Sequence, residues 1–363
     1  MSELKGRRIW VMAKGYSPDE GGMQTYARGV AEGYAALGAV VTVFTQTSAG
    51  PRRAVVGGLD VIDVGPGKSV TIPLRLLKEM RGQLRGGSRP DFIHATTWRT
   101  GLLPLLAGLP YRVTVHGREM SRMKGAGASV MRRVLLKAER VVAVSHYTRS
   151  QLVDRVPQTA DRIVVAWNGI SPNDHAPTAR GNSIPRIFTL CRLEPRKNVA
   201  AAVRAAAACA ARGHRFHYTI AGRGPDRDII AGQIEAAGLG DRVTLAGFVS
   251  DFDAMQLYAD ADIFMHPQVA LEDGRDFEGF GIAIADAMAA GAACIVGREG
   301  GSAELVDEGA GLVVEGRDDI AIEAALATLL ADPVARQAMG ERAASRATRL
   351  FNWQAHCRKV VGD

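Results

Sequence analysis

The stretch DIFMHPQVALEDGRDFEGFGIAIADAMAAGAACIVG, residues 262–297, contains a strand, a loop, a helix and a second strand in that order. DIFMHP and AACIVG are short apolar runs that predict buried strands, and the apolar segment between them predicts a helix that opens near Gly279, with Glu278 just before it. Two consecutive strands joined through a helix lie parallel in one sheet. This stretch therefore predicts an α/β fold with a parallel sheet.

The same alternation extends along the whole chain. A first series of strands is predicted at RRIWVM, AVVTVFT, LDVIDV, DFIHAT, YRVTVH, RVVAVS and RIVVAW, and a second adds RIFTLC, FHYTIAG, RVTLAG and GLVVEG. Between them, ISPNDHAPTARGNSIP is rich in Pro, Asn, Gly and Ser and predicts a linker. We expect two doubly wound, Rossmann-like domains facing each other across a cleft: residues 1–170, and residues 183–345. A C-terminal helix, residues 346–363, is expected to pack back on the first domain.

Composition and charge narrow the class of protein. The chain has 363 residues, of which 47% are hydrophobic and 23% charged, as in folded globular proteins long enough for two cores. Residues 1–182 carry 26 Lys and Arg against 13 Asp and Glu, whereas residues 183–363 carry 19 against 25. The basic first half predicts contact with nucleic acid, an anionic membrane surface or a phosphorylated substrate, unless it is only a solvated surface.

The sequence shows no targeting segment, disulfide framework or metal motif. MSELKGRR leads directly into the strand IWVM, and no apolar run is long enough to span a bilayer. The four cysteines lack a paired or metal-binding spacing. SDFDAMQLYADADIFMHP contains two D-x-D strings, but its pattern predicts a helix capped at Ser250 or Asp251 and then a strand. We expect no metal, and a cytoplasmic protein that is either dissolved or peripheral on the inner face of the cell membrane.

Two carboxylates stand out in the opening stretch, because Glu278 and Asp286 are eight residues apart in an apolar run. On one helix they would be separated by about 12 Å along the axis and about 80° around it, which suits two parts of one extended ligand. The N–H groups of the turn Gly279–Ile282 predict a phosphate site at the start of the helix. The alternative is that Glu278 only begins the helix and Asp286 has a buried partner.

Other predicted strand ends also carry residues suited to ligands, and ligands of open α/β sheets bind at these ends. Arg192 and Lys197 follow the strand RIFTL and suit a diphosphate. Gly21 and Gly22 precede a helix and allow a phosphate to approach, and His116 ends the strand YRVTVH. The alternatives are that Arg192 and Lys197 are solvated surface residues, that Gly21 and Gly22 belong to a simple loop, and that His116 has a structural role.

Taken together, these motifs resemble the retaining nucleotide-sugar glycosyltransferases of family 4, which have the GT-B fold. GGMQTYARG, VTVHGRE, VAVSHYT, NGI, CRLEPRKN, AGRGP, LAGFVSD, FEGFGIAIADAMAAG and EGGSAELV follow the order and spacing of that family over nearly the whole chain. The resemblance implies that the C-terminal domain binds a nucleotide-sugar donor, without a metal or other cofactor, and that the N-terminal domain binds the acceptor.

The resemblance also implies roles for individual residues. The implied catalytic residues are Glu278, which would hold hydroxyls of the donor sugar, His116 at the transferred sugar, and Arg192 and Lys197 at the donor diphosphate. Asp286 would hold the ribose, although the family usually has the longer Glu there. The implied donor-binding residues are, besides these, Gly21, Gly22, Gly247, Phe248, Val249, Gly279, Phe280, Gly281 and Ile282, with Gly247–Val249 facing the base.

The implied reaction is transfer of a hexose to a lipid-linked or glycan acceptor in surface polysaccharide or glycolipid biosynthesis. Mannose from GDP-mannose fits the motifs best, and a UDP-sugar is the alternative. A sugar-nucleotide epimerase on the same fold and a non-catalytic nucleic-acid-binding protein are the alternative functions. GPGKS, residues 65–69, and GRGPDRD do not fit a Walker A loop or a dinucleotide fingerprint, because glycines are missing at the required positions.

The segment 118–140 alternates basic and apolar residues. The basic residues are Arg118, Arg122, Lys124, Arg132, Arg133, Lys137 and Arg140, and the apolar ones are Met120, Met123, Val130, Met131, Val134, Leu135 and Leu136. An apolar stripe flanked by bases predicts contact with an anionic membrane surface. The alternative is that Val134 and Leu135 pack on the sheet while the arginines stay solvated.

Overall fold

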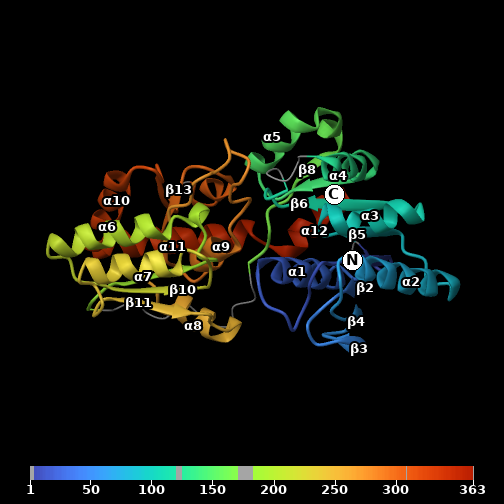
Figure 1. Cartoon of the computed structure of the whole chain (residues 1–363), viewed down its shortest axis with the longest axis horizontal. Coiled ribbons are helices and arrows are strands. Elements are labelled where there is room, and N and C mark those ends of the chain that lie inside the picture. The colour runs from blue at the N-terminus through green and yellow to red at the C-terminus, as the bar shows by residue number, and fades with distance from the viewer. Residues whose placement is uncertain (1–3, 120–124, 171–182, 308, 363) are drawn as a thin grey trace. The chain divides into compact units, whose positions relative to one another are not determined.

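The computed structural model describes residues 4–119, 125–170, 183–307 and 309–362. The chain forms two compact units: residues 1–169 with 352–363 make the N-terminal unit, and residues 170–351 make the C-terminal unit. Each unit contains one sheet with helices packed on it (Figure 1). Most of the linker that the sequence predicts lies outside the described residues.

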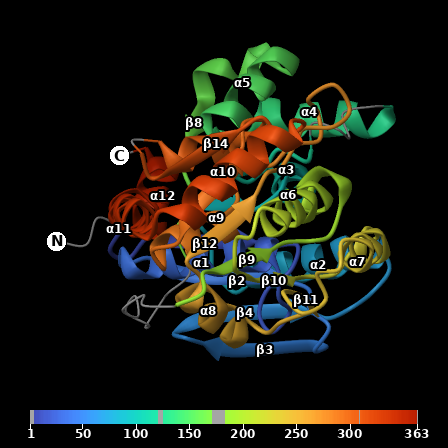
Figure 2. The same cartoon turned by 90° about the vertical axis from the view of Figure 1, so that its left-hand side faces the viewer.

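The N-terminal sheet has the strand order β3-β4-β2-β1-β5-β6-β7-β8. Its strands are β1 Arg8–Met12, β2 Val40–Thr45, β3 Pro51–Val56, β4 Leu59–Val64, β5 Phe92–Ala95, β6 Tyr111–Val115, β7 Arg140–Ala143 and β8 Ile163–Val165. The sequence predicted every one of these except β3. That strand makes the sheet mixed rather than purely parallel, because β3 pairs antiparallel with β4 at the edge (Figure 2). The two are joined by Gly57 and Gly58, whose φ angles of 56° and 79° suit a two-residue hairpin turn.

Among the described residues, the N-terminal unit has the α-helices α1 Gly22–Ala36, α2 Thr71–Arg85, α3 Trp98–Ala107, α4 Ala126–Lys137, α5 His146–Arg155 and α12 Trp353–Val361. The predicted single helix 346–363 is instead the end of α11 and a separate α12, because Asn352 begins a new helix by accepting hydrogen bonds from the N–H groups of Gln354 and Ala355. Helix α12 packs on α1 at Gly29, where an added Cβ would lie 2.1 Å from the Trp353 ring.

The C-terminal sheet is entirely parallel, with the order β11-β10-β9-β12-β13-β14, and the sequence predicted all six strands. They are β9 Arg186–Leu190, β10 His217–Ala221, β11 Val243–Gly247, β12 Ile263–His266, β13 Ala293–Gly297 and β14 Gly311–Val314. The helices are α6 Val199–Ala211, α7 Arg227–Ala236, α8 Asp251–Asp260, α9 Ile282–Ala289, α10 Asp319–Ala331 and α11 Pro333–Leu350.

Helices cover both faces of this sheet. The consecutive residues Ile187 and Phe188 of β9 point to opposite faces, and both are buried. Helices α6 and α10 pack against each other near Ile187, whereas Phe188 packs against Tyr258 of α8. The prediction of two doubly wound α/β domains is therefore confirmed. Among the described residues, no helix combines the length and apolar character that crossing a membrane requires.

Candidate active site

Polar side chains gather in the C-terminal unit at the point where the strand order reverses. The chain adds β10 and β11 on one side of β9 and then places β12 on the other side. Arg196 and Lys197 lie in a short 3-10 helix, Pro195–Lys197, just after β9, and His266 ends β12. Glu278 reaches the same place from the loop that follows β12. Open α/β sheets bind their ligands at such switch points, outside the carboxyl ends of the strands.

The carboxylate of Glu278 is held by two buried bases. Lys197 Nζ and Arg196 NH1 both donate to Glu278 Oε2, the latter at 2.8 Å. The side chains of Glu278, Lys197 and Arg196 are only 14%, 11% and 6% exposed. Burial by itself would raise the pKa of Glu278, but Lys197 and Arg196 outweigh it and hold that pKa well below its usual range. Glu278 is therefore ionised at neutral pH.

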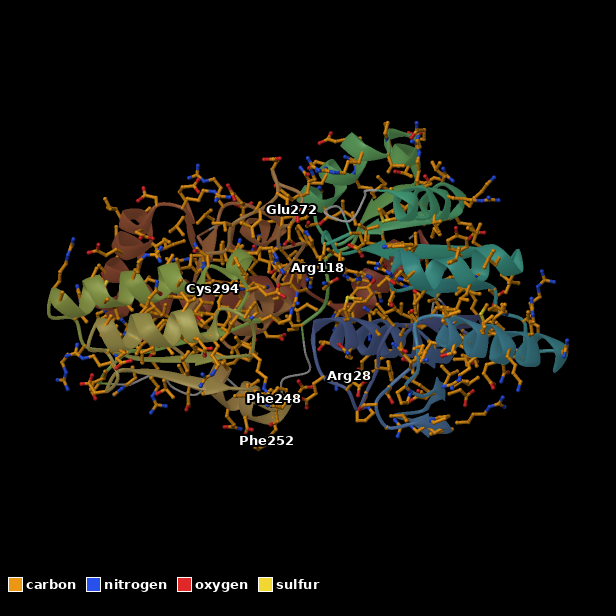
Figure 3. All side chains as sticks on the ribbon, in the orientation of Figure 1. Arg28, Arg118, Phe248, Phe252, Glu272 and Cys294 are labelled. Atoms are coloured by element: carbon orange, nitrogen blue, oxygen red, sulfur yellow. The ribbon has the colours of Figure 1, made fainter. Side chains whose placement is uncertain are left out.

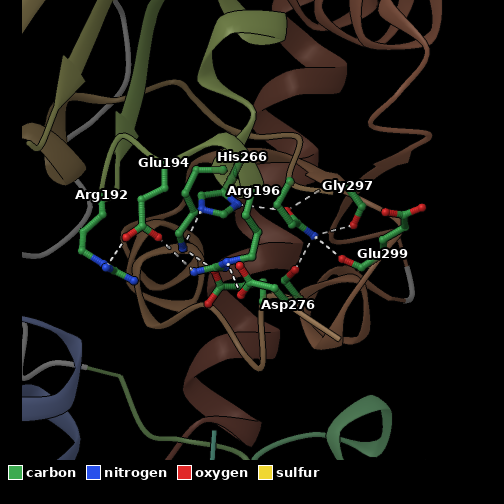
Figure 4. Close-up of polar contacts among 11 residues, drawn as sticks. Arg192, Glu194, Arg196, His266, Asp276, Gly297 and Glu299 are labelled. Atoms are coloured by element: carbon green, nitrogen blue, oxygen red, sulfur yellow. Dashed lines mark hydrogen bonds and ion pairs between the residues drawn. The ribbon is translucent and has the colours of Figure 1, made fainter. Parts of the chain in front are cut away.

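The ion pairs continue from this buried pair toward solvent. Arg196 Nε lies 3.3 Å from Asp276 Oδ1, and Arg196 NH2 lies 3.8 Å from Glu194 Oε2. Glu194 also accepts a hydrogen bond from Arg192, whose side chain is half exposed. The predicted residue Lys197 thus contacts Glu278 directly, whereas Arg192 lies at the exposed end of the same chain of contacts (Figure 4).

The helix that the sequence predicted to open near Gly279 begins later, and Glu278 lies in an extended segment before it. Glu278 forms an extended bridge with Gly300, and its carbonyl accepts from the N–H of Gly301 at 2.8 Å. Helix α9 begins only at Ile282, because its N-cap Gly281 has a φ of 92°, outside the right-handed helical region. The separation from Asp286 calculated for one continuous helix is therefore wrong.

Asp286 lies within α9, half-buried, on the side that approaches α8. Burial raises the pKa of Tyr258 in α8 well above its usual value, and the nearby Asp286 carboxylate raises it further. The two acids of the motif thus come from different elements, an extended segment and a helix. This geometry agrees with contacts to two separate parts of a ligand.

In the predicted phosphate turn, residues 279–282, Phe280 belongs to the hydrophobic core, and α9 begins without a side-chain cap. Phe280 is buried and packs edge-on against Phe351, with ring centroids 5.5 Å apart. Gly281 supplies no side chain to cap α9. The N–H groups at the start of α9, beginning with that of Ile282, therefore have no acceptor from an N-cap side chain, and Gly279 lies just before the cap. The side chain of Phe280 is structural, so any contact of this residue with a ligand is through its backbone.

The predicted base-facing turn follows β11 at the same edge of the sheet. Gly247 has a φ of 68°, and its carbonyl accepts from the N–H of Gly222 at 2.6 Å. Phe248 is 53% exposed, and the guanidinium of Arg223 lies 4.9 Å from its ring centroid. Phe248 and Phe252 are both solvent-exposed aromatic residues (Figure 3). Val249 completes the turn, half-buried.

In the N-terminal unit, the structure brings His116 to the helix that opens at the Gly21–Gly22 turn. His116 follows β6, and its Nε2 donates to the carbonyl of Thr96 at 2.8 Å. Its ring lies edge-on to Tyr26 of α1, with centroids 4.6 Å apart. Helix α1 begins at Gly22, and its N-cap Gly21 has a φ of 135°, which favours glycine.

The two D-x-D strings have structural roles. Ser250 caps α8 by accepting from the N–H of Asp253 at 3.1 Å, as predicted. Asp260 accepts from the guanidinium of Arg186, and Asp262 accepts from the backbone N–H of the same arginine, each at 2.8 Å. The described residues contain no cluster of three or more His, Cys, Asp or Glu side chains suited to a metal ion.

The basic and apolar segment is only partly described, because residues 120–124, including Met120, Arg122, Met123 and Lys124, lie outside the described residues. In α4, Met131, Val134 and Leu135 are buried in the core. The idea that these apolar residues form a stripe for a membrane is therefore wrong. Arg132, Arg133 and Lys137 of the same helix remain exposed.

Sequence reasoning did not select Arg196, Asp276, His266 or Gln268. CRLEPRKN was quoted for Arg192 and Lys197, but the adjacent Arg196 is the more deeply buried base on Glu278. His266 and Gln268 flank Pro267 at the end of a predicted buried strand, and that position was the available signal. Both side chains are buried in the contact network around Glu278.

Comparisons with known proteins identify the family of this chain. Residues 171–346 match the family model Glycosyl transferases group 1, and residues 20–174 match Glycosyltransferase Family 4. A GDP-mannose-dependent alpha-(1-6)-phosphatidylinositol monomannoside mannosyltransferase from Mycobacterium tuberculosis is 30% identical over 260 residues, 68% of this chain and 67% of that protein. The chain belongs to glycosyltransferase family 4.

Further similarities cover nearly the whole chain. A GDP-mannose-dependent monoacylated alpha-(1-6)-phosphatidylinositol monomannoside mannosyltransferase from Corynebacterium glutamicum is 26% identical over 372 residues, 96% of this chain and 95% of that protein. The structure of sucrose-phosphate synthase from Thermosynechococcus elongatus superposes with a TM-score of 0.75 at 21% identity, over 97% and 96% of the two chains. The fold is that of GT-B glycosyltransferases, and the protein is a glycosyltransferase.

Proposed function

We propose that the protein is a retaining, metal-independent hexosyltransferase that moves mannose from GDP-mannose to a lipid-linked or glycan acceptor. The observation that carries this proposal is the buried, ionised Glu278 beside Lys197 at the switch point of the C-terminal sheet. A carboxylate accepts hydrogen bonds from sugar hydroxyls, and an adjacent ammonium donates to a diphosphate. The names of the mannosyltransferase relatives support GDP-mannose as the donor, and a UDP-sugar is the alternative.

The chemistry follows from where charge develops. Breaking the bond between the sugar carbon and the diphosphate oxygen leaves negative charge on the departing diphosphate. Lys197, Arg192 and the first N–H groups of α9 are the donors assigned to that charge. The carboxylates of Asp253, Asp260 and Asp262 in the two D-x-D strings accept hydrogen bonds from Ser250 and Arg186, which supports stabilisation of the diphosphate charge by Lys197, Arg192 and the N–H groups of α9. His116 and the Gly21–Gly22 turn keep the sugar and phosphate roles that the family resemblance implies.

Donor binding is tested by thermal shift with a set of nucleotide sugars, since a donor at 100 times its Kd stabilises the fold by about 2.7 kcal/mol. Glu278→Ala is expected to abolish transfer while nucleoside diphosphate binding persists, whereas Asp286→Ala weakens nucleotide binding. Arg192→Ala and Lys197→Ala are each expected to lower kcat/KM by about 10²-fold or more. Wild-type turnover in all four variants contradicts the site assignment. Loss of activity in EDTA contradicts metal independence. Turnover of the donor without any acceptor indicates an epimerase.

The acceptor is proposed to lie in the N-terminal unit, at an anionic membrane surface. The exposed bases Arg132, Arg133 and Lys137 of α4 support an electrostatic contact, each worth about 1 kcal/mol near an anionic leaflet. Binding to liposomes is then expected to require anionic lipid, to fall as salt rises, and to weaken in the double variant Arg132→Glu, Arg133→Glu. Equal sedimentation with neutral and anionic vesicles, or with neither, indicates a soluble acceptor instead.

A further inference from the structure

Gln268 is buried beside His266. The backbone of Gly297 fixes the orientation of the Gln268 side-chain amide. The Gln268 Nε2 group donates to the carbonyl of Gly297 at 2.6 Å, and Gln268 Oε1 accepts from the N–H of Gly297 at 3.1 Å. The N–H of Gly297 can only donate, and its carbonyl can only accept. A reversed Gln268 amide would place Nε2 against the N–H and Oε1 against the carbonyl, and neither contact is a hydrogen bond. Ser302 Oγ also accepts from Gln268 Nε2. The oxygen of Gln268 therefore points in one fixed direction.

That oxygen sets the position of the proton on His266. Gln268 Oε1 lies 2.9 Å from His266 Nδ1. An amide oxygen only accepts hydrogen bonds, so Nδ1 carries the proton. Burial, reinforced by the charge of Lys197, lowers the pKa of His266 to about 4, so the ring is neutral at pH 7. The other ring nitrogen, Nε2, then has a lone pair and accepts.

The lone pair of His266 faces Lys197, whose Nζ lies 3.4 Å away. Lys197 also donates to Glu278 Oε2. An ammonium group has three N–H donors, so one remains after these two contacts, and it has no partner among the residues the structure describes. The two contacts fix the direction of this third donor.

We propose that Gln268 is a positioning residue that locks His266 in its Nδ1–H tautomer, so that His266 and Glu278 together aim one N–H of Lys197 at an anionic ligand. The identity of that ligand, the diphosphate of a sugar nucleotide, rests on the proposed function above. The His266 tautomer and its effect on Lys197 do not depend on the proposed function. Gln268 itself touches no reacting atom.

The tautomer is measured first, in the wild-type protein. Nitrogen-15 NMR of the histidine rings distinguishes a protonated from an unprotonated ring nitrogen and both from an imidazolium. The chain has 8 histidines, so the His266 signals are assigned by their loss from the spectrum of His266→Gln. We expect a neutral ring with the proton on Nδ1 at pH 7. An Nε2–H tautomer or an imidazolium overturns the proposal, whatever the enzyme's substrate.

The effect on the ligand is measured by calorimetry with GDP and UDP on folded variants. Glu278 raises the pKa of His266, whereas Lys197 and Arg196 lower it. In Gln268→Glu, a second carboxylate beside the ring raises this pKa further, so the ring is expected to be protonated at pH 7. Its Nε2 then donates and repels Lys197. Binding is expected to weaken by about tenfold or more at pH 7, the scale of one lost hydrogen bond to a charged group, and to recover as rising pH neutralises the ring. A purely structural role for Gln268 gives no such recovery.

Two further variants separate positioning from packing. Ser302→Ala removes one acceptor of Gln268 but leaves its oxygen on His266, so binding and tautomer are expected to match the wild type. His266→Gln places an amide oxygen near the position of Nε2, and this oxygen accepts from Lys197 whatever residue stands at 268. Adding Gln268→Glu to His266→Gln is therefore expected to leave GDP and UDP binding unchanged. Equal losses from Gln268→Glu in both backgrounds overturn the proposal. If wild-type protein binds neither GDP nor UDP, the donor proposal fails, and the NMR result alone decides the tautomer.

Discussion

Glu278→Gln is the substitution that most directly tests the buried ion pairs. It keeps the size of the side chain and removes only the negative charge, so no cavity is formed. Two buried cations, Arg196 and Lys197, then share fewer acids. Arg196 keeps Asp276 at 3.3 Å and Glu194 at 3.8 Å, whereas Lys197 keeps only the neutral ring of His266 among the described residues. We therefore expect Lys197 to carry most of the destabilisation.

The magnitude follows from burial. Removing one partner of a buried ion pair costs about 3–5 kcal/mol. Because Arg196 retains two acids, we expect the lower value, about 3 kcal/mol. For a unit of this size, about 2–4 °C of Tm is lost per kcal/mol, so the unfolding transition of the C-terminal unit is expected to fall by about 6–12 °C. Added pyrophosphate supplies the missing negative charge, so it is expected to raise Tm more in the variant than in the wild type.

The assay is differential scanning calorimetry with and without pyrophosphate. The matched control is Asp319→Asn, which breaks the Arg204–Asp319 pair of the same unit, whose side chains are 46% and 49% exposed. Exposed pairs contribute about 1 kcal/mol or less, so this variant is expected to stay close to the wild-type Tm. A Glu278→Gln protein that unfolds within about 2 °C of the wild type, with an unchanged response to pyrophosphate, refutes the argument that Glu278 neutralises these two bases.

Two other predictions concern stability. Burial lowers the pKa of both His266 and His356 to about 4, below the ordinary value of about 6.5. The unfolded chain therefore binds more protons below pH 6.5, and stability is lost as pH falls from there toward 4. Each ring is expected to remove about 2 kcal/mol at pH 5, measured by urea unfolding against pH, and His356→Gln is expected to flatten that dependence. Gly29→Ala places a Cβ 2.1 Å from the Trp353 ring and is expected to cost about 1–3 kcal/mol, whereas Gly232→Ala in α7, where the Cβ meets nothing within 4 Å, is expected to stabilise slightly, both measured by urea unfolding. Equal free energies of unfolding for the two glycine variants contradict the packing of α12 on α1.

The strands were predictable because most of them are buried on both faces. Runs such as RIFTL and IFMH are apolar at consecutive positions, which is typical of parallel strands covered by helices on both sides. Strand β3 was missed because PRRAVV is largely exposed and has only one neighbour in the sheet. Its pairing depends on the glycine turn rather than on burial, so its apolar pattern carries little signal.

The site was predictable in kind but not in its contacts. Strand-end positions selected Lys197 and Glu278, which are 81 residues apart, and the structure brings these two side chains into contact because β9 and β12 are neighbours. The helix start predicted near Gly279 was too early, since α9 begins at Ile282. A glycine that adopts a positive φ, as Gly281 does, leaves no mark in an apolar periodicity. Arg196 was missed because an arginine after a strand looks the same in a sequence whether its side chain is solvated or buried.

The buried pairs also bear on how a donor would be selected. Glu278 and Lys197 are not two separate solvated groups waiting for a ligand, because each neutralises the other in the fold. A lone phosphate on the third N–H of Lys197 weakens the neutralisation of the buried Glu278 carboxylate, and a lone sugar that binds Glu278 weakens the neutralisation of Lys197. A ligand with a sugar and a diphosphate joined at the right distance compensates both groups at once. For the donor proposed above, the coupling of these two side chains therefore favours the intact sugar nucleotide over either of its parts.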